Sequence, residues 1–574
     1  MNWLSRWFGW FGPELSDLCC AVDAGQDRRS QKMLLFFSPD WGTGLPKAMH
    51  LMSSILDWRH FYMNDTQPAP VRIETGLIQG FSTGPLTVYQ SIPYAAPPVG
   101  ELRWRAPQPA LPWQGVRRAD TFGPIAMQTG ASVPAAPPES ISEDCLTLNI
   151  WTSAKLDNEQ LAVMVWIPGG GFTQESASTP LYWGDALATR GVIVVTINYR
   201  VGLLGFLAHP ELSRESGHDS SGNYGLLDQI AALAWIKRNV AAFGGDPENV
   251  TIWGQSAGSM AVNLLMASPV ARGLFQRAIG QSGGFFTPPA ATGSPEDRYL
   301  KGAQEQGLRL ARALGAESLA DLRKLEPEQF LKDGLGGTTY PIIDGYVLPE
   351  EPYTAFASGR QNDVPLLIGS NADEGRPMIA GRNVRRASFA EDIGEAFGSK
   401  VVRKLAEEYL TIYPATNDQE ALETRAAFER DLRFGWDMWT WARLQAATGR
   451  ARVFYYYFAH VPPYPQASNF AGWGAGHWAE LRYVFDHLSQ EAWAWSDSDR
   501  AIANALATYV TNFAKNGDPN GAGAAVWPDY TSDSARVLHI DGTLRVGGVP
   551  NLAGLRQLDL RYQNLRSATQ VPHA

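Results

Sequence analysis

Residues 249–268 read NVTIWGQSAGSMAVNLLMAS and join three pieces of local structure that together decide the fold. Residues 249–253 are rich in β-branched and aromatic side chains, which is typical of a strand. Residues 259–268 are mostly apolar, which favours a buried helix. Between them, GQSAG (254–258) matches the GxSxG pattern, in which a serine occupies a sharp turn between a strand and a helix. We therefore predict that Ser256 is a nucleophile.

A second match to this pattern, GQSGG at residues 280–284, contains Ser282. It also follows a strand-like run, but it leads into FFTPPAATGSP (285–295). Pro288 and Pro289 lack an amide hydrogen and disfavour the helix that the turn requires. We therefore interpret Ser282 as a buried structural hydroxyl.

Short apolar runs alternate with helix-like segments through the middle of the chain. The clearest helix has apolar residues spaced by three or four positions from Leu226 to Phe243. Buried strands that alternate with helices predict an α/β fold, with a mostly parallel central sheet and helices on both faces. Such a sheet binds ligands at the carboxyl ends of its strands. Residues 388–448 are mainly helical in pattern, which predicts an inserted helical region over that edge. The strand-like runs are residues 146–153, 162–167, 192–198, 250–253, 277–280 and 364–369.

The N-terminal part of the chain differs from the rest. Its first residues mix Trp and Phe with charged residues and proline, so they lack the apolar run and cleavage site of a signal peptide. Two β-rich runs follow at 71–81 and 86–94, and the STGP between them predicts a hairpin. We expect residues 1–65 to be a disordered or loosely attached extension without a catalytic role, with a lid or a membrane-surface segment as alternatives. Residues 66–574 are expected to form one catalytic domain.

Composition excludes several classes of function. The 48 basic and 58 acidic residues give a net charge of −10, and no basic cluster suggests a nucleic-acid partner. The apolar runs are far shorter than the roughly 20 residues that a transmembrane helix needs. The three cysteines, Cys19, Cys20 and Cys145, form neither a disulfide framework nor a zinc motif, so no metal is expected. These observations predict a soluble protein with a small-molecule substrate, and they do not indicate the oligomeric state.

Three consecutive glycines, Gly169, Gly170 and Gly171, follow the strand-like run at 162–167. A glycine run at the carboxyl end of a strand lets the backbone approach a ligand with its amides exposed. In folds with a serine turn of this kind, such a loop supplies donors for an oxyanion. A tight turn without a ligand is the alternative interpretation.

Taken together, these features resemble the type B carboxylesterase family, which includes bacterial para-nitrobenzyl esterases and animal cholinesterases. The resemblance covers residues 71–550 and implies an α/β-hydrolase fold, a catalytic triad in the chain order Ser, acid, His, and no cofactor. The motifs that carry it are SEDCLTLNIW (142–151), GGGF (169–172), NYRVGLLGFL (198–207), GNYGLLDQ (222–229), FGGDPENVTIWGQSAGS (243–259) and LFQRAIGQSG (274–283).

The resemblance implies that Glu374, in SNADEG (370–375), is the acid of the triad. A carboxylate at the carboxyl end of a strand can also hold an imidazole in the useful orientation. The neighbouring Asp373 is the rival. The base must follow the acid, and the resemblance to GAGHWAELRYVF (474–485) implies His477. The other histidines in that part of the chain are His460, His487, His539 and His573.

The resemblance also implies that the backbone amides of Gly170, Gly171 and Ala257 form the oxyanion hole. Aromatic side chains beside the catalytic motifs are candidates for the substrate pocket, because ligand sites are mostly apolar. On this ground we predict that Phe172 and Trp478 line the pocket.

The chain departs from the family pattern at three positions. Pro168 stands where many relatives have histidine, and Gln255 where glutamate commonly precedes the nucleophile. Ala126 stands where many relatives have the cysteine that pairs with the equivalent of Cys145. Cys145 is therefore expected to be a buried free thiol, which favours a cytoplasmic location over export.

Two further positions match family residues that form an internal ion pair near the sheet, Glu143 and Arg200. The main prediction is a serine hydrolase that cleaves small to medium carboxylic esters through an acyl-enzyme. An amidase, carbamate hydrolase or lipase with the same triad is the alternative. A non-catalytic, cholinesterase-like binding module would require the loss of a triad residue, and all three candidates are present.

Overall fold

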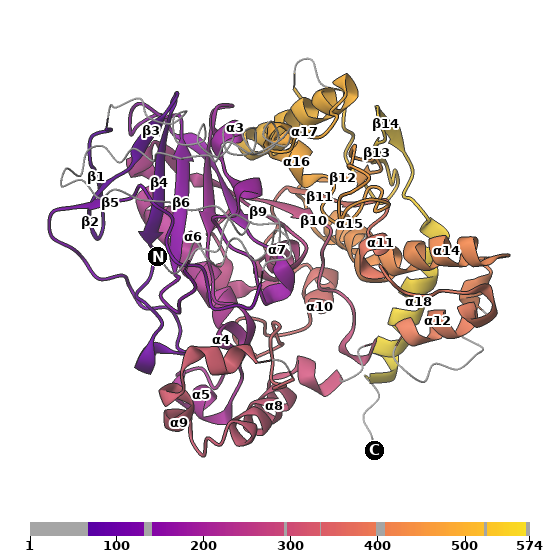
Figure 1. Cartoon of the computed structure of the whole chain (residues 1–574), viewed down its shortest axis with the longest axis horizontal. Coiled ribbons are helices and arrows are strands. Elements are labelled where there is room, and N and C mark those ends of the chain that lie inside the picture. The colour runs from indigo at the N-terminus through magenta and orange to yellow at the C-terminus, as the bar shows by residue number, and fades with distance from the viewer. Residues whose placement is uncertain are drawn as a thin grey trace, which may run out of the picture. The chain divides into compact units, whose positions relative to one another are not determined.

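A large mixed sheet organises the chain (Figure 1). A computed structural model describes residues 67–130, 140–291, 295–332, 334–397, 408–521 and 525–569. The extension predicted at residues 1–65 lies outside the described residues. The strands of the sheet are β3 (Phe81–Thr83), β4 (Leu86–Pro93), β6 (Thr147–Thr152), β7 (Leu161–Ile167), β8 (Val192–Ile197), β9 (Gly245–Gln255), β10 (Arg277–Gln281), β11 (Leu366–Asn371), β12 (Val453–Phe458), β13 (Val537–Ile540) and β14 (Leu544–Gly547).

The strands lie in the order β14-β13-β12-β11-β10-β9-β7-β8-β6-β4-β3. All neighbouring pairs from β8 to β13 are parallel. The pairs at the two edges, from β8 through β6 and β4 to β3 and from β13 to β14, are antiparallel. The predicted mostly parallel sheet is thus confirmed, with antiparallel strands added at both edges.

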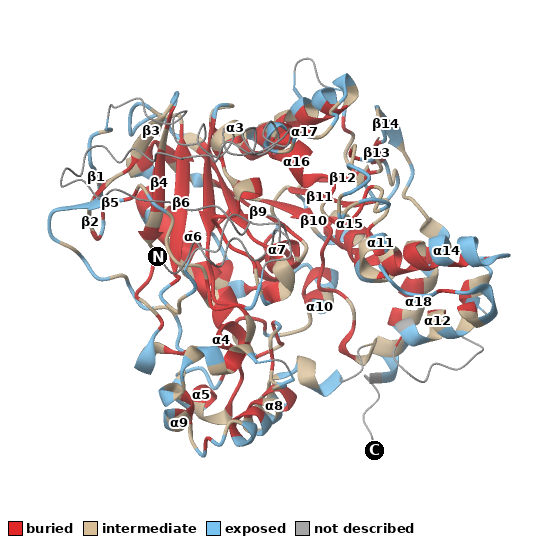
Figure 2. Cartoon of the chain, viewed as in Figure 1, coloured by how far each residue is buried: buried red, intermediate tan, exposed pale blue. Residues whose placement is uncertain are grey.

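The sheet has an apolar core on each face. Val163, Val165 and Ile167 of β7 belong to one core, whereas Met164 and Trp166 belong to the other. Because both faces are covered, the central strands are buried along their length (Figure 2) and read as continuous apolar runs. The first core includes helices α6 (Tyr224–Asn239), α7 (Ala257–Ala267), α15 (Trp436–Thr448) and α18 (Leu552–Thr569), and the second includes α3 (Asp185–Ala188), α16 (Leu481–Val484) and α17 (Asp497–Asn516).

The region before β4 differs in part from its prediction. The hairpin of β3 and β4 is present, with Phe81 opposite Val88. However, the run predicted as one strand at 71–81 is divided among β1 (Val71–Ile73), β2 (Gly76–Gln79) and β3. The chain reverses at Glu74 and Thr75, so β1 and β2 pair with each other, and β2 also pairs with β5 (Val116–Arg118).

The predicted helical character of residues 388–448 is confirmed where the chain is described. Helices α12 (Phe389–Ala396) and α14 (Asp418–Arg430) lead to α15, and a π-helical turn at Asp431–Gly435 joins the last two. No helix in the described ranges is long and apolar enough to cross a membrane. The other α-helices in the described part of the chain are α4 (Gly202–Phe206), α5 (Pro210–Glu215), α8 (Leu300–Ala313), α9 (Leu319–Lys324), α10 (Pro352–Ala357) and α11 (Gly375–Met378).

Candidate active site

Ser256 lies at a sharp turn between β9 and α7. Its φ of 56° and ψ of −126° are strained for a residue with a side chain, and such strain is common at functional sites. The turn depends on two glycines. A Cβ on Gly258 would lie 2.0 Å from the carbonyl oxygen of Ile167, and one on Gly254 would lie 2.4 Å from the backbone of Gly258. Ser256 itself remains partly exposed, so its hydroxyl is available to a substrate.

Ser282 occupies a similar turn but has a different environment. Its φ is 54°, its amide donates to the carbonyl of Gly369 at 2.8 Å, and its side chain is fully buried. Its hydroxyl has no hydrogen-bond partner in the described part of the chain. The next residue, Gly283, packs against Ser256, because a Cβ there would lie 2.3 Å from the Ser256 carbonyl oxygen. The second turn therefore packs against the first, and its buried serine hydroxyl is inaccessible to a substrate.

The glycine loop after β7 contacts the serine turn directly. A Cβ on Gly169 would lie 2.6 Å from the carbonyl oxygen of Gln255, 3.3 Å from Ser256 Cβ and 3.6 Å from the Ala257 amide nitrogen. Gly170 and Gly171 have φ values of 72° and 64°, which favour glycine. The structure thus brings the three proposed amide donors onto two touching segments.

A buried carboxylate contacts the ring of His477. Glu374 Oε2 lies 2.5 Å from His477 Nδ1, and both side chains are almost completely buried. The other oxygen of Glu374 accepts a hydrogen bond from the Asn371 amide at 2.8 Å. The rival Asp373 instead accepts from the Ala475 amide at 2.9 Å and pairs with Arg376. Glu374, and not Asp373, therefore faces the imidazole.

The ring of His477 lies beside the residue that precedes Ser256. Gln255 Nε2 donates to the His477 carbonyl at 2.7 Å and lies 3.4 Å from His477 Nε2. Phe434, from the π-helical turn, stacks on the ring with 4.4 Å between centroids. Among the described residues no hydrogen bond joins the Ser256 hydroxyl to His477. Catalytic hydrogen bonds are often long without substrate and shorten when it binds.

Sequence reasoning missed a second buried carboxyl, Glu480. Gln281 donates to its Oε1 at 3.2 Å, and the side-chain amide of Asn371 donates to its Oε2. Burial, together with the negative charge of Glu374, raises the pKa of Glu480 to about 8. The available signal was a single acidic residue, three positions after His477, in a stretch that is mainly apolar.

Comparison with known proteins agrees with this geometry. The profile described as "Carboxylesterase family" matches residues 67–555. The chain belongs to the carboxylesterase family. Its predicted α/β-hydrolase fold and ester-hydrolase activity are thereby confirmed.

Three relatives illustrate the similarity. Fumonisin B1 esterase of Sphingopyxis macrogoltabida is 37% identical, over 80% of this chain and 84% of that protein. Para-nitrobenzyl esterase of Bacillus subtilis (strain 168) is 35% identical, over 84% of this chain and 96% of that protein. A solved PNB esterase structure matches with a TM-score of 0.73 and 31% identity, covering 85% of this chain and 99% of its own.

The aromatic residues near the site of this carboxylesterase differ in accessibility. Phe172 is fully buried and packs edge-on against Phe206 and Tyr340. These contacts anchor the end of the glycine loop in the core. Trp478 is partly exposed, with its ring 5.0 Å from that of His477. Tyr340, which the sequence did not suggest, is 44% exposed, and its hydroxyl lies 3.6 Å from where a Cβ on Gly171 would be. Trp478 and Tyr340 are therefore aromatic rings with exposed surface near the candidate site.

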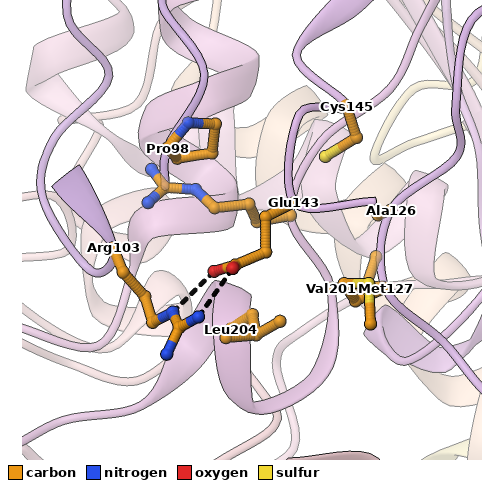
Figure 3. A pocket seen from close by; sticks show the side chains of 9 residues that line it. Pro98, Arg103, Ala126, Met127, Glu143, Cys145, Val201 and Leu204 are labelled. Carbon is orange, nitrogen blue, oxygen red and sulfur yellow. Dashed lines mark hydrogen bonds and ion pairs between the residues drawn. The ribbon is translucent and has the colours of Figure 1, made fainter. Parts of the chain in front are cut away.

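The expected ion pair between Glu143 and Arg200 is wrong, because each residue pairs with a different partner. Glu143 binds Arg103 through two hydrogen bonds of 2.6 and 2.7 Å (Figure 3). Arg200 binds Asp228 of α6 through bonds of 2.6 and 2.8 Å. Arg103, Glu143 and Arg200 line a small cavity beside Cys145. Two separate pairs thus replace the single pair that was expected.

Cys145 is a buried free thiol in the carboxylesterase, as predicted. Burial raises the pKa of this thiol, so it stays protonated and unreactive at neutral pH. Within the described ranges, no group of three His, Cys, Asp or Glu side chains is placed to hold a metal ion.

Proposed function

We propose that this carboxylesterase hydrolyses small to medium carboxylic esters through an acyl-enzyme on Ser256, with His477 as general base and Glu374 as its partner. The observation that carries the proposal is the buried 2.5 Å contact between His477 Nδ1 and Glu374 Oε2. It lies beside a strained serine turn that the glycine loop touches.

The mechanism follows from these positions. Ser256 Oγ attacks the ester carbonyl while His477 Nε2 takes its proton, and Glu374 stabilises the imidazolium that forms. The amides of Gly170, Gly171 and Ala257 donate to the oxyanion of the tetrahedral intermediate. The alcohol leaves with the proton from His477. Water then repeats the sequence on the acyl-enzyme and releases the acid.

The accessible rings of Trp478 and Tyr340 support esters with an apolar or aromatic acyl or alcohol group, because aromatic side chains bind such groups well. Two relatives are named for esterase activity on para-nitrobenzyl esters and on fumonisin B1. A cytoplasmic location is part of the proposal and is supported by the free thiol of Cys145. A non-catalytic role for residues 1–65 is also proposed, since the family match begins at residue 67.

Kinetics of two serine variants test the proposal. Full-length protein should hydrolyse short-chain p-nitrophenyl esters faster than long-chain esters and the matched p-nitroanilide. Ser256→Ala should lower kcat by several orders of magnitude, up to about 10⁶, because the nucleophile is lost. The matched variant Ser282→Ala should keep most of the activity, since that hydroxyl is buried.

Two results would contradict the proposal. One is an equal loss of activity in both serine variants while circular dichroism shows that both are folded. The other is turnover of the anilide alone, which would make the enzyme an amidase.

A further inference from the structure

Tyr199 lies two residues beyond β8, and its side chain reaches the loop that carries two of the proposed oxyanion donors. The ring is buried, and its hydroxyl donates to the carbonyl of Pro168 at 2.9 Å and lies 3.3 Å from the carbonyl of Gly169. Burial raises the pKa of this phenol, and the charge of Glu175 adds to the effect, so the hydroxyl keeps its proton at neutral pH. Both carbonyls therefore point toward Tyr199.

The direction of a carbonyl fixes the direction of the next amide. A peptide group is planar and trans, so its C=O and N–H bonds point in opposite directions. The carbonyl of Gly169 shares a peptide group with the amide of Gly170. With that carbonyl turned toward Tyr199, the Gly170 N–H must point away from Tyr199.

The neighbouring peptide group is held in a different way. The carbonyl of Gly170 accepts hydrogen bonds from the amides of Thr173 at 3.1 Å and Gln174 at 3.2 Å. These backbone bonds fix the plane that carries the Gly171 N–H. Of the two loop donors, only the Gly170 amide therefore depends on a distant side chain for its orientation.

The glycine loop needs such a restraint. Consecutive glycines have wide conformational freedom, so their peptide planes can rotate. An oxyanion hole stabilises the transition state only if its donors are already aligned when charge develops. We propose that Tyr199 is a positioning residue whose hydroxyl holds the Gly169–Gly170 peptide plane, so that the Gly170 amide is aligned with the oxyanion. This inference rests on the proposed function of Ser256.

Tyr199→Phe tests the inference because it removes only the hydroxyl. The matched control is Tyr509→Phe, since Tyr509 is also buried and its hydroxyl donates to the Ala525 carbonyl at 2.7 Å, away from the glycine loop. We measure kcat and KM for p-nitrophenyl butyrate. We also measure inhibition by a trifluoromethyl ketone, which serine converts to a hemiketal with an oxyanion.

Tyr199→Phe should lower kcat by about tenfold, less than the 10²–10³ that loss of a whole donor costs, and leave KM within about twofold. Affinity for the ketone should fall by the same factor as kcat/KM. Tyr509→Phe should keep the activity and ketone affinity of the unmodified enzyme, even if its melting temperature falls as much as that of Tyr199→Phe.

Equal kinetics in Tyr199→Phe and Tyr509→Phe would overturn the inference, as would a rise in KM with unchanged kcat. Ser256→Ala, measured in parallel, separates this failure from that of the proposed function. If Ser256→Ala loses activity but Tyr199→Phe does not, only the inference fails. If Ser256→Ala remains active, the proposed function fails and the inference with it.

Discussion

Two buried carboxyl groups share one polar residue at the candidate site. Asn371 donates its backbone amide to Glu374 and its side-chain amide to Glu480. Two negative charges buried so close together would repel each other. The pKa of about 8 keeps Glu480 mostly protonated at pH 7. Glu374 is the carboxyl group that contacts His477, so it is placed to stabilise the imidazolium. Environment thus gives two identical side chains different roles.

The raised pKa of Glu480 predicts a pH dependence of stability. Between its ordinary value of 4.5 and about 8, the folded chain holds this proton while the unfolded chain loses it. The folded state binds more protons, so this contribution to stability is present at low pH and is lost as pH rises. The slope from one such group is at most about 1.4 kcal/mol per pH unit. Glu480→Gln, which has no proton to lose, should show a smaller loss of stability with pH.

Urea unfolding at several pH values from 5 to 8 measures this slope. Glu101→Gln is the control, because the Glu101 side chain is 85% exposed and should leave the slope unchanged. A Glu480→Gln variant whose unfolding free energy falls with pH as steeply as that of the unmodified chain would show that Glu480 is ionised in the folded state.

The candidate nucleophile, acid and base could be predicted residue by residue because each lies in a local motif. The prolines that follow the second motif favour Ser256 over Ser282, and in the structure an α-helix begins directly after Ser256 but not after Ser282. Glu480 and Tyr340 could not be predicted. Their roles depend on contacts with segments far away in the sequence, which no local pattern records.

At the scale of elements, the serine turn depends on close packing of α7 against β7. A Cβ on Gly258 would lie 2.0 Å from the carbonyl oxygen of Ile167 and 3.1 Å from two further backbone carbons. Backbone atoms cannot move aside as a flexible side chain can. The helix and the strand end must therefore separate if Gly258 acquires a side chain.

Gly258→Ala should consequently lower the free energy of unfolding by about 3 kcal/mol or more, the upper range for overpacking, and abolish ester hydrolysis. Gly548→Ala is the matched control, because a Cβ there has no atom within 4 Å, and it should change stability by less than about 0.5 kcal/mol. Urea midpoints and initial rates measure both effects. A fully stable and active Gly258→Ala enzyme would show that the turn is less tightly packed than described.

Most of the central strands could be predicted as elements, and so could the edge hairpin of β3 and β4, whereas β12 and the other antiparallel pairings at the edges could not. Strands such as β7 and β8 are short apolar runs buried on both faces, and that composition is visible in the sequence. The other antiparallel pairings at the two edges of the large sheet depend on which strands lie next to each other, and the sequence does not show this order. In a separate three-stranded sheet, the chain reverses at Glu74 and Thr75 between β1 and β2, where the sequence suggested one continuous strand.

For the whole molecule, the fold class could be predicted from the order of strand-like and helix-like segments, but the partners of the buried charged residues could not. Arg103 binds Glu143, which is 40 residues away, and also donates to the Leu325 carbonyl just beyond α9. Arg200 binds Asp228 across 28 residues. Each guanidinium pairs with the carboxylate that the folded chain brings close to it. The ion-pair partners can therefore be identified only from the three-dimensional structure.

The two serine turns also concern the whole molecule, because they come from separate strands and pack against each other. Only one of the two serines is accessible. The proposed function therefore requires that a reagent for activated serines should modify Ser256 and no other serine in the chain.

Mass-spectrometric mapping after treatment with a fluorophosphonate tests this requirement most directly. We expect a single phosphonylated residue, Ser256, with loss of ester hydrolysis in proportion to the label and no label on Ser256→Ala. Labelling of Ser282, or inactivation without any label on Ser256, would show that Ser256 is not the nucleophile.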